Sequence, residues 1–155
     1  MKKRYLSLVC VIAFLLSVSG INVCASEQTP MVDGSYLTHD EESVGEAVQT
    51  VRGVYLATGT SKVSKASSTA INAGGTTTAH QTVADIGIAV VVERLKKGTS
   101  TWSYYRTWQV EKTNASSVMS SKNLTVTKGY YYRVRSTHWA NSDASSSSTD
   151  GIYIG

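Results

Sequence analysis

The chain has 155 residues, a formal net charge of +4 at pH 7 and a hydrophobic content of 41%. This length is sufficient for one ordinary domain that builds its own core. Both cysteines, Cys10 and Cys24, lie among the first 25 residues. A chain without those residues can have no disulfide framework, no thiol nucleophile and no cysteine-ligated metal, so its stability must come from burial.

The first 25 residues have the pattern of a cleaved signal peptide. Residues 2–4 are basic, Leu6 to Val18 is an apolar run, and Val23-Cys24-Ala25 predicts cleavage after Ala25. The apolar run is short for a membrane span. A lipoprotein anchored through Cys24 is the alternative, but Val23 does not suit that cleavage site. We therefore expect a secreted, extracellular protein with no membrane span after cleavage, either free or associated with the cell wall.

Residues 26–50 are predicted to form an acidic, mobile leader before the domain. Six acidic residues and no Lys or Arg fall in residues 26–46, whereas the predicted mature chain has 12 basic and 11 acidic residues in total. The leader holds the only proline, Pro30, and shows little apolar periodicity. Such a segment buries too little surface to offset the cost of ordering it. The alternative is a helical turn or two within residues 40–48.

Residues 51–155 are predicted to form a single all-β domain. Ile86 to Leu95 is rich in β-branched residues on both faces and predicts a central strand, followed by a hairpin loop at Lys96 to Ser100. Trp102, Tyr104, Arg106, Trp108 and Val110 are expected to share one face of the return strand. A turn is expected at 73–76, loops at 114–121 and 144–149, and a last strand at 150–154. Short strands with frequent turns are typical of a β-sandwich of the immunoglobulin or fibronectin type III kind, with a small β-barrel as the alternative.

Gly129 to Trp139 is the clearest strand with two different faces. Alternation places Tyr130, Tyr132, Val134, Ser136 and His138 toward the core. The opposite face carries Tyr131, Arg133, Arg135 and Trp139. Arginines between aromatic rings can stack on them and still present a fork to a carboxylate or phosphate. This face is the candidate binding site, and a solvated outer sheet surface is the alternative interpretation.

The start of this strand resembles the corner between strands E and F of fibronectin type III domains. Val126, Gly129, Tyr132 and Val134 occupy the positions of the corner pattern, although Lys128 stands where a proline is usual. The resemblance implies that the hydroxyl group of Tyr132 bonds back to the backbone.

Residues 51–154 also resemble a family of small exported proteins of unknown function from Gram-positive, Clostridia-type bacteria. The similar features include Gly59-Thr60-Ser61, Trp102, the run from Gly129 to Val134, His138 and Thr149-Asp150-Gly151-Ile152. The resemblance implies export and an all-β fold, and it assigns no activity and no functional residues.

No catalytic, metal or cofactor motif is evident in the sequence. His39, His80 and His138 lack partners at metal-ligand spacing, and the domain has no phosphate-binding glycine loop and no nucleophile elbow. The small mature charge argues against nucleic acid. We therefore expect a non-enzymatic domain that binds a cell-wall polymer, a glycan or a protein at the cell surface. The alternatives are a small secreted hydrolase whose site is dispersed in sequence, and a self-associating matrix or structural protein.

Overall fold

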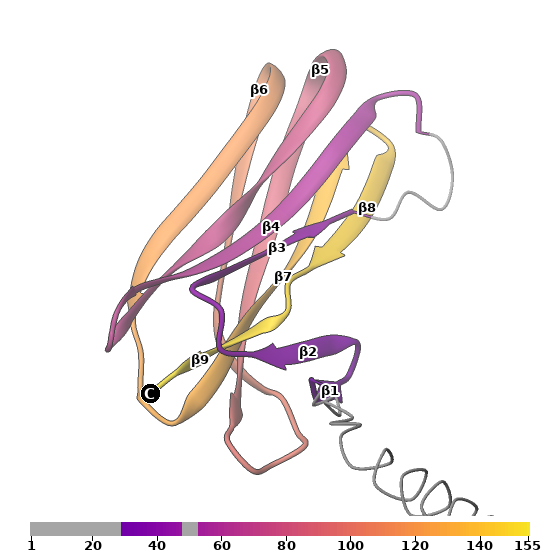
Figure 1. Cartoon of the computed structure of the whole chain (residues 1–155). Coiled ribbons are helices and arrows are strands. Elements are labelled where there is room, and N and C mark those ends of the chain that lie inside the picture. The colour runs from indigo at the N-terminus through magenta and orange to yellow at the C-terminus, as the bar shows by residue number, and fades with distance from the viewer. Residues whose placement is uncertain (1–28, 48–52) are drawn as a thin grey trace, which may run out of the picture.

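The computed structural model describes residues 29–47 and 53–155 (Figure 1). The predicted signal peptide, residues 1–25, lies outside the described residues, as do both ends of the predicted leader and residues 51–52. The described part of the chain consists of strands and their connections, and the predicted all-β class is confirmed. Within that part there is no helix long and apolar enough to cross a membrane.

Nine strands of residues 29–47 and 53–155 belong to one sheet, ordered β1-β2-β9-β7-β5-β4-β3, with β6 beside β5 and β8 beside β7. Their bounds are β1 Met31–Val32, β2 Ser35–Thr38, β3 Glu42–Glu46, β4 Leu56–Ser67, β5 Ala70–Lys96, β6 Ser103–Thr125, β7 Tyr130–Ala140, β8 Asp143–Ser148 and β9 Gly151–Ile154.

The long hairpin of β5 and β6 joins two halves of the sheet that face one another. Residues 70–79 of β5 lie between β4 and β6, whereas residues 86–96 lie between β6 and β7. The pairing of β5 with β6 shifts register between these two parts, and both strands turn over at the top of the molecule in Figure 1. The result is a strongly curled sheet that combines features of the expected sandwich and of the alternative barrel.

The core lies between the two halves and is built from the inward face of β5. Ile86, Ile88, Val90 and Val92 have no exposed surface, and β6 and β7 flank them on either side. The predicted central strand is therefore confirmed. Each such side chain contributes about 1.5–3 kcal/mol by burial.

The corner before β7 has the hydrogen bonds expected of a tyrosine corner. The Tyr132 hydroxyl donates to the Thr127 carbonyl oxygen at 2.9 Å and accepts from the Thr127 amide at 3.0 Å. Gly129 makes the turn with a φ of 85°, a conformation that favours glycine. The expected bond from Tyr132 to the backbone is confirmed.

The predicted mobile leader is wrong for residues 31–46, because this segment supplies three strands of the sheet. β1 and β2 form a hairpin, β2 pairs in parallel with β9, and β3 pairs with β4 over five residues. The turn between β1 and β2 is Asp33-Gly34, with φ angles of 49° and 75°. A two-residue Asp-Gly turn is typical of a β-hairpin. The conformational entropy lost when this segment becomes ordered is offset by its pairing with strands far away in sequence. The composition of the segment alone cannot predict that pairing.

Three predicted irregular segments are strands. The expected turn at 73–76 lies inside β5, where a Cβ on Gly74 would come within 1.9 Å of the Ser120 carbonyl oxygen. Gly74 and its neighbour Gly75 therefore serve to let the adjacent strands pack closely, and they do not form a turn. The expected loop at 114–121 continues β6 through Asn114, whose φ is 51°. Most of the expected loop at 144–149 is β8, which pairs with β7 from Arg135 to Ala140.

Candidate functional site

Arg133 of the predicted binding face is buried and holds the N-terminal hairpin. Its side chain is 1% exposed, and its Nε donates to a carboxylate oxygen of Glu93 at 2.8 Å. Its terminal nitrogens donate to the Asp33 carboxylate at 2.6 Å and to the Ser35 hydroxyl at 3.0 Å. Hydrogen bonding to Arg133, with the charge of its guanidinium, lowers the pKa of Asp33. All these bonds are internal, so Arg133 is not available to a ligand.

Trp102 completes the surroundings of Arg133. The Arg133 guanidinium lies 4.2 Å from the centroid of the Trp102 ring, and the indole nitrogen donates to the Val32 carbonyl oxygen at 3.0 Å. The hairpin of β1 and β2 therefore covers one part of the outer face of β7, and Arg133 and Trp102 together hold it there.

The structure does not bring the predicted binding face together as one exposed surface. Tyr131 is 7% exposed and packs beside the rings of His39 and Tyr153. The indole nitrogen of Trp139 donates to the Asp85 carboxylate at 3.0 Å. Its ring lies against Gly87, where a Cβ would come within 1.9 Å of it. Of the four predicted residues, only Arg135 is exposed.

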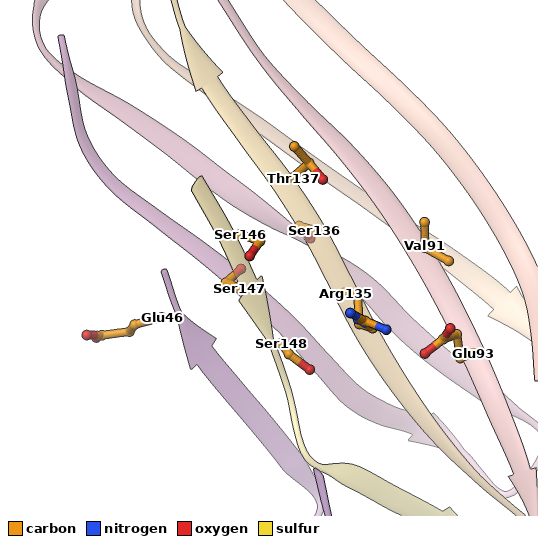
Figure 2. Close-up of a pocket in the computed structure, with 9 residues that line it drawn as sticks. All are labelled: Glu46, Val91, Glu93, Arg135, Ser136, Thr137, Ser146, Ser147 and Ser148. Carbon is orange, nitrogen blue, oxygen red and sulfur yellow. The ribbon is translucent and has the colours of Figure 1, made fainter. Parts of the chain in front are cut away.

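Arg135 lies in an open groove on the outer face of the sheet, shown in Figure 2. The groove measures about 590 Å³ and runs over β5, β7 and β8, with one residue from β3. Its lining residues are Glu46, Val91, Glu93, Arg135, Ser136, Thr137, Ser146, Ser147 and Ser148. Thr137, Ser146 and Ser148 are exposed because alternation turns them away from the core.

The groove is polar but close to neutral. Arg135 forms no ion pair with any residue in 29–47 or 53–155. The charge of Glu93 is matched by Arg133, and Glu46 supplies one further negative charge. The arrangement offers donors from Arg135, acceptors from the carboxylates, and hydroxyl groups that can do both.

Behind the groove, a buried polar network links the two halves of the sheet. His138 has no exposed surface; its Nε2 lies 2.7 Å from the Ser147 hydroxyl and its Nδ1 lies 2.8 Å from the Thr77 hydroxyl. Ser147 lies 2.6 Å from the Ser61 hydroxyl, which donates to Ser136 at 2.7 Å. These side chains come from β4, β5, β7 and β8.

Both ring nitrogens of His138 lie within hydrogen-bond distance of a hydroxyl group, so one nitrogen donates and the other accepts when the imidazole is neutral. The Thr77 hydroxyl also donates to the Gly87 carbonyl oxygen at 3.0 Å. Burial lowers the pKa of His138 to about 4, so the imidazole is neutral at pH 7.

The buried imidazole predicts acid sensitivity of the fold. A histidine has a pKa of about 6.5 when unfolded, so the unfolded chain binds a proton at His138 more readily than the folded chain does. The stability that depends on a neutral His138 is fully present above pH 6.5 and is lost as the pH falls toward 4. We expect the free energy of unfolding to fall by about 1.4 kcal/mol per pH unit within this window from His138 alone. Urea titrations across this range measure it.

His138→Gln is expected to be less stable at pH 7 and to show a flatter pH dependence. The matched control is His80→Gln, because His80 is exposed on the same chain and its replacement leaves the network intact. If wild type and His138→Gln lose stability equally between pH 6.5 and 4, another group is responsible.

Sequence reasoning found Arg135 but missed the residues around it. The sequence predicts a loop at Ser146 and Ser148, because serine favours turns and no apolar alternation marks β8. It predicts that Glu46 belongs to the leader. The Asp33-Gly34 dipeptide was the one signal that could have revealed the N-terminal hairpin. In the described residues, no group of three or more His, Cys, Asp or Glu side chains is placed to hold a metal ion.

The fold and the groove define a small all-β domain with one curled sheet and a polar groove on its outer face. The chain belongs to a family of unknown function (DUF6147), whose model matches residues 30–152. The match includes β2 and β3, in agreement with their place in the sheet. No curated protein and no solved structure matches the chain.

Proposed function

We propose that this protein is an exported, non-enzymatic binding domain that takes a glycan in the groove around Arg135. Export is supported by the basic, apolar and small-residue pattern of residues 1–25. The observation that carries the binding proposal is the position of Arg135, which forms no ion pair with the residues that the structure describes, in an open groove beside exposed hydroxyl groups (Figure 2).

The chemistry of the groove favours a neutral glycan over a strongly anionic wall polymer. Every sugar hydroxyl is both a donor and an acceptor, and the groove offers both kinds of partner. An anionic polymer would meet the Glu46 carboxylate as well as Arg135, whereas the Glu93 carboxylate is already paired with Arg133. Like charges brought together in this way disfavour binding. The lining residues also lie on paired strands, which hold their positions without a ligand.

Arg135→Gln is expected to reduce binding of the protein to neutral cell-surface glycans. A hydrogen bond from a charged group contributes about 1.5–3 kcal/mol, so the affinity should fall by at least about tenfold. The measurement is a glycan array, followed by titration of the strongest neutral ligand. Binding should change little with salt, because the recognised ligand carries no charge.

Lys62→Gln is the matched control, because it removes the same charge from an exposed side chain of β4. Circular dichroism of both variants checks that the fold is retained. Equal affinity of folded Arg135→Gln and wild type contradicts the assignment of the groove.

A further inference from the structure

A second group of arginines and aromatic rings lies near the connection between β5 and β6, beside the second register shift of this pair, between Val92 and Glu93. The Arg94 guanidinium lies 5.3 Å from the ring centroid of Tyr105 and 5.0 Å from that of Tyr130. The Arg106 guanidinium lies 4.9 Å from the same Tyr105 ring. Two cations thus share one aromatic ring, and a second ring supports one of them.

A β-bulge produces this arrangement. Val92 pairs with Arg106 and Glu93 pairs with Tyr104, so Tyr105 is an extra residue on β6. A bulge re-aims side chains and disturbs strict alternation. The predicted common face from Trp102 to Val110 is therefore interrupted at Tyr105, and Tyr105 contacts the hydrophobic core while Tyr104 is 62% exposed.

In the described ranges, the guanidinium groups of Arg94 and Arg106 form no ion pair, in contrast to the paired Arg133. The Nε atom of Arg94 is also buried and has no hydrogen-bond partner. Buried donors are normally satisfied, so one without a partner requires an explanation. One donor of Arg106 is used by the Tyr105 carbonyl oxygen at 3.0 Å, and Arg94 also hydrogen-bonds to the Tyr132 side chain. The rings hold the two guanidinium groups in place, and their remaining N–H donors can serve a ligand.

We propose that Arg94 and Arg106, supported by Tyr105 and Tyr130, form an oxyanion site for a phosphate or carboxylate group of an acidic polymer. A guanidinium group binds either oxyanion through two parallel N–H donors. Aromatic rings beneath the guanidinium groups reduce the freedom that binding would otherwise remove. This site is separate from the groove around Arg135, whose lining residues include none of these four.

Titration calorimetry with two probes tests the site and identifies the acid. The probes are short-chain inorganic polyphosphate and an oligogalacturonate, which carry phosphate and carboxylate groups respectively. We expect wild type to bind at least one of them, with affinity that falls as salt rises. Arg94→Gln with Arg106→Gln should reduce that affinity by at least about tenfold. The preferred probe identifies the oxyanion.

The control is Lys62→Gln with Lys112→Gln, which changes the net charge equally at exposed positions and should keep wild-type affinity. Arg106 is exposed, so Arg106→Gln alone tests the site even if replacement of Arg94 prevents folding. The inference is overturned if wild type binds neither probe. It is also overturned if the folded arginine variant binds as tightly as the lysine control. Neutral-glycan binding in the groove should be unchanged in the arginine variant.

Discussion

Replacing Val90 with aspartate is expected to unfold the domain. Val90 has no exposed surface and lies on β5 directly between Trp108 of β6 and Ser136 of β7. An aspartate there loses the apolar contacts of the valine and places a carboxyl group in a core that is built for an apolar side chain. The cost should exceed about 5 kcal/mol, which is the lower end of the total stability of ordinary domains.

Circular dichroism and a thermal melt measure this effect. Val44→Asp is the control, because Val44 is 53% exposed on β3 and its replacement should change stability by no more than about 0.5 kcal/mol. A cooperative melt of Val90→Asp near the wild-type temperature would show that β5 is not the centre of the core.

Removing the guanidinium group of Arg133 is expected to destabilise the domain by about 3–5 kcal/mol. Arg133→Met keeps much of the side-chain length but leaves the Glu93 carboxylate, which is 20% exposed, without its cation. It also removes the bonds that hold Asp33 and Ser35 of the N-terminal hairpin. The loss from Asp33 itself should be small, because its side chain is 67% exposed.

Arg135→Met is the stability control from the same strand. Arg135 is exposed and unpaired within the described residues, so we expect a change within about 0.5 kcal/mol. Urea denaturation compares the two variants. A loss for Arg133→Met no larger than for Arg135→Met would mean that the N-terminal hairpin contributes little to the stability of the fold. The removal of Arg133 is therefore a test of stability and not of binding.

The sequence predicts the regular, β-branched strands well. Ile86 to Val92 and the inward residues of β7 lie where alternation placed them, because burial of one face dictates the spacing of apolar residues. The Tyr132 corner was also predictable, since it depends on residues close together in sequence. The strands that lack such patterns were missed: β8 is a run of serines held by its pairing to β7, and β3 is acidic and held by β4.

The candidate site could be predicted only in part. Alternation along one strand tells which residues share a face, but it does not tell which part of that face another segment covers. Arg133 and Arg135 are two residues apart and share one face of β7, yet one is buried and the other exposed. The difference comes from the hairpin at residues 31–38, which covers Arg133 and leaves Arg135 open. Similarly, Arg94 meets Tyr105 through a bulge, which separates Tyr104 from the face that it was predicted to share with Arg106, Trp108 and Val110.

The binding site in the groove can be tested most directly by backbone NMR of the labelled protein during titration with its strongest neutral glycan. The proposed function predicts that the largest amide shifts fall on residues 135–137 of β7 and 146–148 of β8, with smaller changes near Glu93. Those shifts should saturate together, and in folded Arg135→Gln they should need at least about tenfold more glycan to reach the same extent. Shifts that saturate elsewhere, such as around the exposed Tyr36 or Tyr104, with β7 and β8 unchanged, would contradict the groove as the binding site.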